Sequence, residues 1–345
     1  MTTVSIDSFA APWNPDPGGL WTLTSTPDAG FVGVTGMQIV SSSGLAADPA
    51  PFAQRQFPTA LDLRAYDELR FWFRSSRSGD GSPTRPFYLI FEADVTPPSG
   101  APWSRLLAIH KPETWDLHRL WLADMPAAMR SAVGVMRLRS LNPGIAFVAS
   151  IDSLIATTPD PIQDVEAALL GRLHNRFQVV TGGGPISVPA LFDVPEIQQT
   201  PAMPFILITP WSLRRSPAER EGGELIDNFT AQGAYVRPPA ERLRLQYSLD
   251  VFATERTQKA SVFEQILHDL LADTHLIVNN ERLEIGSFSP AAELATVLIA
   301  TRRTPIFCEV TVSVDVIPRQ FQPWAVPLVY TAPLDGREVA ELTVP

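Results

Sequence analysis

The sequence predicts two units: an N-terminal all-β jelly-roll sandwich and a C-terminal α+β unit whose helices pack on a mainly antiparallel sheet. Three observations predict this. The length of 345 residues fits two domains. The 33 prolines, about twice the usual share, disfavour a long helical bundle. The hydrophobic pattern changes from strand-like to helical periodicity near residue 160.

The first part of the chain is predicted to consist of strands. Residues 69–74 alternate apolar and basic side chains, which is the period of a half-buried strand. Residues 86–92 form a continuous apolar and aromatic run, as in a central strand. Further strands are expected at residues 103–109, 115–122, 133–141 and 146–156, with one helical turn at 127–132. Short strands separated by turn residues favour a sandwich over residues 1–157.

The second unit, residues 158–321, is predicted to begin with a helix at 160–177. Asp160 is a good N-cap and Pro161 suits the first helical position. A second helix is expected at 258–273, and strands are expected at residues 186–194, 204–213, 242–254, 276–285 and 306–318. Residues 214–241 are predicted to form a long loop, and residues 322–345 an extended arm.

Charge and composition exclude several classes of protein. The net charge is −10, with 12 basic and 14 acidic side chains in residues 1–157 and 15 and 23 in the remainder. This acidic balance argues against a dedicated nucleic-acid-binding protein. No apolar run reaches the ~18–20 residues that cross a bilayer, so no membrane partner is expected. The N-terminus has no basic region or apolar core that would target secretion.

The sequence shows no pattern typical of catalysis, and neither an enzyme nor a cofactor is expected. The single cysteine, Cys308, excludes an internal disulfide and is interpreted as a buried inert thiol. No paired-histidine motif, nucleophile elbow or phosphate loop occurs. Glu92 and Asp94 share a strand face, which leaves a glycan-active enzyme as a third and weaker reading.

The N-terminal part resembles the carbohydrate-binding-module, or galactose-binding-like, jelly rolls. The matching segments are residues 6–9 with Trp13 and Trp21, then 67–74, 114–120 and 151–156. The resemblance implies glycans as partners, with sugar rings stacking on exposed aromatics. The candidate platforms are Trp13, Trp21, Trp103 and Trp121. Core packing is the alternative for each ring, because its large area favours burial.

Some modules of this type hold a structural calcium ion near their termini. Asp7 and Asp152 are the oxygen donors that paired terminal strands would bring together. Two donors fall short of the six to eight that calcium takes, so no metal site is predicted.

The C-terminal part resembles the tail-terminator, or tail-completion, proteins of tailed phages and the cap proteins of contractile injection systems. The matching segments are residues 162–170, 192–196, 204–208, 245–253 and 262–271. The resemblance implies a homo-hexameric ring that caps the tail tube or sheath. Tube, sheath or neck proteins would be its partners, and DNA would pass through the lumen without specific binding. The expected location is the virion tail or neck, assembled in the host cytoplasm.

Four arginines of the long loop are the candidate contacts to a neighbouring subunit or the tube: Arg214, Arg215, Arg220 and Arg237. A guanidinium forms bidentate ion pairs and stacks on aromatics, which suits interfaces; a solvated loop is the alternative.

The leading hypothesis is therefore a structural ring protein with an outer jelly roll. The second hypothesis is a lectin-like glycan-binding module docked on a tail or injection particle. Phage or injection system, and tube or sheath, stay open.

Overall fold

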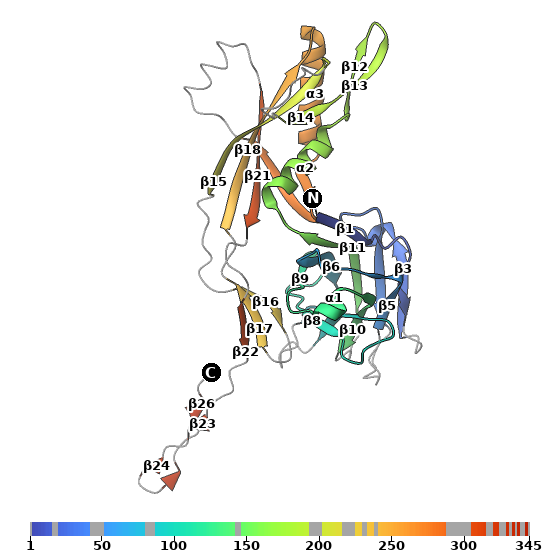
Figure 1. Cartoon of the computed structure of the whole chain (residues 1–345), viewed down its shortest axis with the longest axis vertical. Coiled ribbons are helices and arrows are strands. Elements are labelled where there is room, and N and C mark those ends of the chain that lie inside the picture. Colours follow the sequence, from blue (N-terminus) through green and yellow to red (C-terminus); the bar gives the residue numbers. More distant parts are fainter. Residues whose placement is uncertain are drawn as a thin grey trace.

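The computed structural model describes most of the chain. The described residues are 2–15, 20–41, 52–79, 87–141, 146–192, 202–215, 225–229, 233–237, 241–287, 305–314, 320–323, 329–330, 333–334, 337–338 and 342–343. Figure 1 shows two bodies, with the N-terminal one at the lower right and the C-terminal one above it. Arg220 of the predicted contacts lies outside the described residues.

The N-terminal body is a sandwich of two antiparallel sheets. One sheet has the order β3-β4-β11-β6-β9, with β1 paired to β11, and the other has the order β2-β5-β10-β7-β8. Their bounds are β1 Thr2–Asp7, β2 Asn14–Pro15, β3 Trp21–Thr26, β4 Gly36–Ser41, β5 Phe52–Leu61, β6 Glu68–Ser75, β7 Tyr88–Asp94, β8 Trp103–Leu107, β9 Asp116–Trp121, β10 Val133–Leu141 and β11 Val148–Thr158. Two short helical segments, η1 (Pro27–Ala29) and α1 (Ala127–Arg130), complete it. The predicted jelly-roll sandwich is confirmed.

The C-terminal body is built on a six-stranded sheet of order β14-β15-β18-β21-β20-β19. Only the β14–β15 pair is parallel in it, so the predicted α+β class is confirmed. The elements are α2 Pro161–Leu173, β12 Phe177–Thr181, β13 Gly184–Val188, β14 Ala190–Phe192, β15 Phe205–Arg215, β18 Glu241–Phe252, α3 Arg256–Ala272, β19 His275–Val278, β20 Glu281–Ser287 and β21 Ile306–Val314. Strands β12 and β13 form a separate hairpin.

The sequence placed α2, α3 and strand β10 well, and several other segments differ. The described part of the predicted strand 186–194 is divided between β13 and β14, which belong to different sheets. Residues 276–285 were predicted as one strand, but the chain turns back at Asn279 and Asn280 to make β19 and β20. The predicted loop 214–241 contains β16 (Leu225–Phe229) and β17 (Gly233–Arg237). Both segments pair within the chain, and β17 also pairs with β22 (Gln320–Pro323), a long-range contact that local composition does not reveal.

The start of the predicted arm also differs, because residues 322 and 323 belong to β22. The remaining described strands pair among themselves: β23 (Val329–Tyr330) with β26 (Leu342–Thr343), and β24 (Pro333–Leu334) with β25 (Arg337–Glu338). Among the described residues, no helix combines the length and apolar character needed to span a membrane.

Each body has its own hydrophobic core. The sandwich core draws its buried residues from 9–156, and the second core draws them from 165–312. Helices α2 and α3 share the second core with alternate residues of the sheet, such as Leu245, Tyr247 and Leu249 of β18. Asp160 caps α2 by accepting a hydrogen bond from the backbone N–H of Gln163, as the sequence predicts.

Arg172 of α2 fastens the C-terminal end of α3. Its guanidinium pairs with the Asp269 carboxylate at 2.9 Å and donates to the carbonyls of Asp269, Asp273 and His275 at 2.6–2.9 Å. The last turn of a helix leaves its carbonyls without intrahelical partners. One half-buried cation therefore satisfies the end of α3 and orients it against α2.

Replacing Arg172 by Met should lower the free energy of unfolding by about 2–4 kcal/mol, because the carboxylate and three carbonyls lose a charged donor. Arg176→Met is the matched control. Arg176 meets the other oxygen of Asp269 at 3.3 Å but is 64% exposed, so its loss should cost less than about 0.5 kcal/mol. Urea denaturation of both variants measures the difference; equal losses would contradict this role.

Candidate functional site

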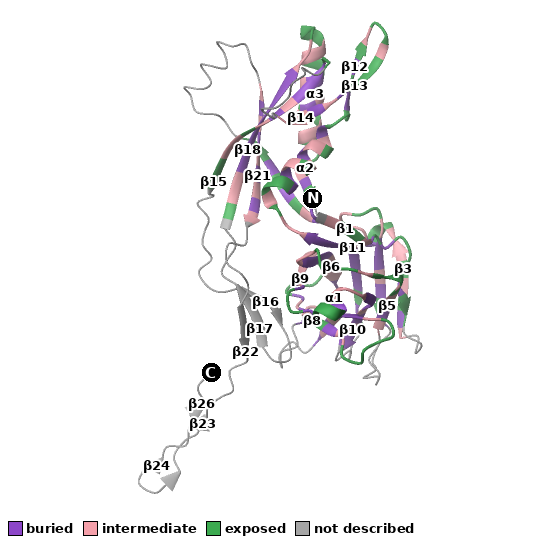
Figure 2. Cartoon of the chain, viewed as in Figure 1, coloured by how far each residue is buried: buried purple, intermediate pink, exposed green. Residues whose placement is uncertain are grey.

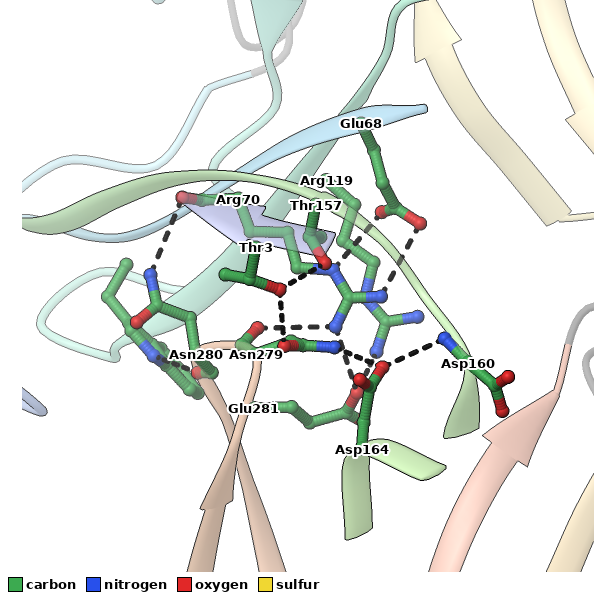
Figure 3. Close-up of polar contacts among 11 residues, drawn as sticks. Thr3, Glu68, Arg70, Arg119, Thr157, Asp160, Asp164, Asn279, Asn280 and Glu281 are labelled. Carbon is green, nitrogen blue, oxygen red and sulfur yellow. Dashed lines mark hydrogen bonds and ion pairs between the residues drawn. The ribbon is translucent and has the colours of Figure 1, made fainter. Parts of the chain in front are cut away.

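The most extensive polar cluster that the structure describes lies between the two bodies, where the tip of the β19–β20 hairpin meets the sandwich (Figure 3). Asn279 and Asn280 form this tip, and both adopt left-handed backbone conformations with φ of 47° and 66°. A two-residue hairpin turn that matches strand twist needs such angles at both positions, and Asn tolerates them. Both residues are buried.

Asn280 binds the last strand of the sandwich. The side-chain amide of Asn280 donates to the backbone carbonyl of Ser153. The Ser153 hydroxyl donates in return to Oδ1 of Asn280 at 2.7 Å. The indole N–H of Trp72 donates to the Asn280 carbonyl at 2.6 Å. Ser153 is itself left-handed, at a register shift in β11. The bulge in one body is thus fitted to the turn in the other.

Asn279 connects three elements. Its side-chain carbonyl accepts from the Thr3 hydroxyl at 2.7 Å, and its amide donates to the Asp164 carboxylate in the first turn of α2. The same carboxylate oxygen accepts from the backbone N–H of Asp160 at 2.8 Å. The start of α2, strand β1 and the hairpin tip are therefore held by one side chain (Figure 3).

Buried charges complete this joint. Arg70 is 5% exposed and lies between Glu68 on its own strand, at 3.3 Å, and Glu281 of β20, at 3.6 Å. Its guanidinium also donates to the Asn279 carbonyl at 3.3 Å. Arg119 pairs with the same Glu281 carboxylate at 2.7 Å. Removing one member of such a buried set leaves an uncompensated charge, which costs about 3–5 kcal/mol.

An aromatic cluster borders the joint. Phe31 contacts Trp72 and Trp115 with ring centroids 4.5 and 5.3 Å apart, and the Arg282 guanidinium lies 5.7 Å from its ring. The loop carrying Phe31 is fixed by Asp152, whose Oδ2 accepts from three consecutive backbone N–H groups at 2.7–2.9 Å.

The structure corrects three of the four candidate sugar platforms. Trp13, Trp21 and Trp103 are 2%, 2% and 5% exposed and belong to the sandwich core, so their faces are not accessible to a sugar. The Trp13 indole also donates to Asp7 at 2.9 Å. Trp121 is half-buried at the end of β9, opposite Glu68. It lies on the strand face of Arg70 and Arg119, which belong to the joint, and it stays a candidate platform.

The candidate arginines are only partly placed. Arg214 is exposed near the end of β15, directly opposite Arg244 of β18. Arg215 and Arg237 lie in β15 and β17, but their side chains are outside the description.

Glu92 and Asp94 share one face of β7, as the sequence predicts; both are also buried, and each is held by the protein. Glu92 pairs with Arg139. Burial raises the pKa of Asp94, but hydrogen bonds from Ser99 and Val95 outweigh that effect, so the pKa of this carboxyl is lowered. A general acid near neutral pH needs the opposite shift.

Other titratable groups are packed into the cores. Burial raises the pKa of the Cys308 thiol to about 12, which keeps it protonated and inert. Burial lowers the pKa of His118 to about 4; its ring is neutral and stacks on Phe71. Asp7 accepts from the Phe9 N–H at 2.7 Å and from Trp13. Within the described residues, no group of three or more His, Cys, Asp and Glu side chains is arranged to hold a metal.

The joint is not predicted by the sequence patterns above, although the sequence contains one signal for its turn. An Asn-Asn pair stands between the apolar run 276–278 and residues 281–285, in which Leu283 and Ile285 alternate with polar side chains. Two turn-forming residues between two strand-like runs indicate a hairpin. That the turn would be buried against the other body is a long-range property that the pattern does not carry.

The comparisons with known proteins bear on both bodies. No protein-family model matches the chain, and no curated protein matches it in sequence. Among solved structures, it is similar to the family 11 carbohydrate-binding module of the cellulase Lic26A-Cel5E of Clostridium thermocellum, with 9% identity over 46% of this chain and 95% of that one and a TM-score of 0.34.

Two other similar structures are parts of injection particles. One is the PVC sheath/tube terminator of an extracellular contractile injection system, with 17% identity over 54% of this chain and 66% of that one and a TM-score of 0.39. The other is the tube-terminating cap of the anti-feeding prophage, with 14% identity over 52% and 62% and a TM-score of 0.37. Both kinds of protein named by the sequence resemblances are therefore among the similar structures.

Asn280→Ala should destabilise the joint by about 2–4 kcal/mol, because it adds left-handed backbone strain to the loss of the Ser153 hydrogen bonds. Asn175→Ala is the matched control: Asn175 follows α2 with φ of 57° but is exposed. This substitution adds only backbone strain, so the free energy of unfolding should fall by about 1 kcal/mol. Denaturant titration gives both values. Equal losses would show that the side chain of Asn280 does not stabilise the joint.

Proposed function

We propose that this chain is a ring-forming cap of the tail-terminator or neck type on a phage-tail-like or contractile injection particle. The observation that carries the proposal is the apolar surface of the C-terminal body. Val180, Leu271 and Leu213 are 80%, 78% and 55% exposed there. They lie on three different elements, β12, α3 and β15, and each is available for a protein–protein contact. The helix and strand order that the sequence shares with tail terminators supports this class of assembly.

The position of the sandwich is compatible with a ring. It contacts the C-terminal body through the β19–β20 tip and the start of α2, whereas the β12–β13 hairpin lies at the far end of that body (Figure 1). The sandwich therefore leaves the hairpin accessible. In the proposed particle, the jelly roll sits on the outside of the ring.

The finer parts of the proposal concern partners. The ring is a homo-hexamer located at the tail or neck of the particle, and tube, sheath or neck proteins bind it. Arg214 is its exposed basic contact, with Arg215, Arg220 and Arg237 as further candidates. The excess of 23 acidic over 15 basic side chains in residues 158–345 repels phosphate, so DNA passes the lumen without being held.

Light scattering of the purified chain should give the mass of a closed ring, and adding it to polymerising tube protein of its particle should shorten the tubes seen by electron microscopy. The expected cause is that a bound ring blocks the growing end. Tubes grown with an equal amount of bovine serum albumin are the control. Monomers alone, with and without tubes, would overturn the proposal.

A glycan-binding role is the second candidate, and the outer face of the β5–β10–β7 sheet favours it. The Arg137 guanidinium lies 5.9 Å from the Phe52 ring and donates to the Gln54 side chain at 2.7 Å. Tyr88 and Ile90 of β7 are half-buried on the same face. Planar polar groups beside aromatic rings are the chemistry that binds sugar hydroxyls and sugar faces.

If this face binds glycans, a glycan array probed with the full chain should give hits that weaken about tenfold or more in Arg137→Ala, because a donor and a stacked surface are lost. Arg64→Ala is the control, since Arg64 is exposed and pairs only with neighbouring Asp62 in the described residues. An array without hits, or hits unaffected by Arg137→Ala, would reject this face as a sugar site.

A further inference from the structure

The β12–β13 hairpin is an uncharged projection on an acidic protein. Residues 177–192 contain no Asp, Glu, Lys or Arg. The hairpin extends beyond the rest of the C-terminal body, and its tip is exposed (Figures 1 and 2). Val180 is 80% exposed and Ile186 38%. Solvated strand edges usually carry charges that prevent association, whereas the centres of protein interfaces are depleted of charge.

One flank of α3 holds the hairpin to its own body. Phe177 and Val179 of β12 are buried in the core that contains Val262 and Ile266 of α3. The Gln265 side-chain amide donates to the Gln178 carbonyl at 3.0 Å and accepts from the Gln178 N–H at 3.3 Å. The edge of β12 is thus bound by α3 at Gln178. Val180 lies on the face of the hairpin opposite Phe177 and Val179, whereas Ile186 is paired with Val179 and lies on the same face as it.

The opposite flank of α3 carries a second exposed apolar surface. Leu267 and Leu271 are one helical turn apart and are 37% and 78% exposed. At 100° per residue they lie roughly 200–240° around the helix axis from Gln265. Leu267 and Leu271 together are called the leucine flank. Phe263 and Leu270 are partly buried and lie between the leucine flank and the core.

We propose that the hairpin of one copy packs on the leucine flank of a second copy, with Val180 against Leu267 and Leu271. This inference rests on the proposed ring function and names the contact that closes the ring. A cyclic assembly needs two different patches that meet head to tail. The chain provides both patches, the hairpin and the leucine flank, on opposite flanks of α3. The hairpin of each copy can therefore contact the leucine flank of the next copy around the ring.

Cysteine cross-linking tests the contact and its direction. Val180→Cys and Leu271→Cys are made separately, and Cys308 adds no background because it is 1% exposed and its pKa is raised to about 12. Under mild oxidation, the mixture of the two variants should give disulfide-linked dimers, and each variant alone should not. The double variant should give a ladder of covalent oligomers. Dimers from either single variant alone would indicate a two-fold contact and overturn the proposal.

Charge substitution gives an independent measurement. Val180→Asp should weaken self-association at least tenfold in analytical ultracentrifugation, because an unpaired carboxylate would be buried at the contact. Val34→Asp is the matched control: Val34 is 89% exposed on the sandwich, so the same substitution there should leave association unchanged. Equal association of wild type and Val180→Asp would overturn the proposal.

The two proposals fail in different ways. If the wild-type chain forms rings but Val180→Cys and Leu271→Cys do not cross-link, the ring function stands and this contact is wrong. If the wild-type chain stays monomeric with and without tubes, the ring function itself fails. If Val180→Cys and Leu271→Cys cross-link while tubes keep their length, the contact stands and the capping role fails.

Discussion

The buried turn at Asn279 and Asn280 is the interaction on which the arrangement of the whole molecule depends. Its amides and carbonyls satisfy groups that belong to the sandwich, including Ser153 and Thr3, and it receives donors from Trp72 and Arg70 in return. Buried polar groups are almost always paired in native proteins. Because the partners here come from both bodies, separating the bodies would leave these groups to water. The joint therefore fixes how the two bodies are arranged.

That joint also determines which surfaces remain for partners. The sandwich presents the sheet containing β11 and β6 to the C-terminal body, so the other sheet, with Phe52 and Arg137, faces away from it. On the C-terminal body, the joint occupies the tip of the β19–β20 hairpin and leaves the flanks of α3 outside it. The proposed glycan face and the proposed contact with a second copy are consequently separate, and occupation of one need not affect the other.

Local patterns predicted the elements that depend on local chemistry. The Asp160 cap and the apolar spacing of α2 specify a helix in any context, and β10 was located to the residue. The failures share a cause in long-range contacts. Trp13, Trp21 and Trp103 are core residues because the two sheets close over them, which a strand pattern alone does not reveal. Strand β17 pairs with its neighbour β16 in a hairpin and also with β22, about 85 residues later in the chain, and only the first of these pairings is local. The Asn279–Asn280 turn was readable as a turn, but its burial depends on a bulge at Ser153.

The joint is a polar contact within one chain, whereas the hairpin surface is an apolar surface proposed to contact another chain. Their different chemistry fits these different roles. The joint is rich in charges and hydrogen bonds, which demand accurate geometry, and its two halves are tethered by one chain, so meeting costs little entropy. A contact between separate chains must offset the loss of translational and rotational freedom. Apolar area provides that driving force without needing exact partners, and an uncharged hairpin provides it without desolvating ions. An inter-chain contact is therefore expected at Val180 of the uncharged hairpin and at Leu271, and not at the polar joint.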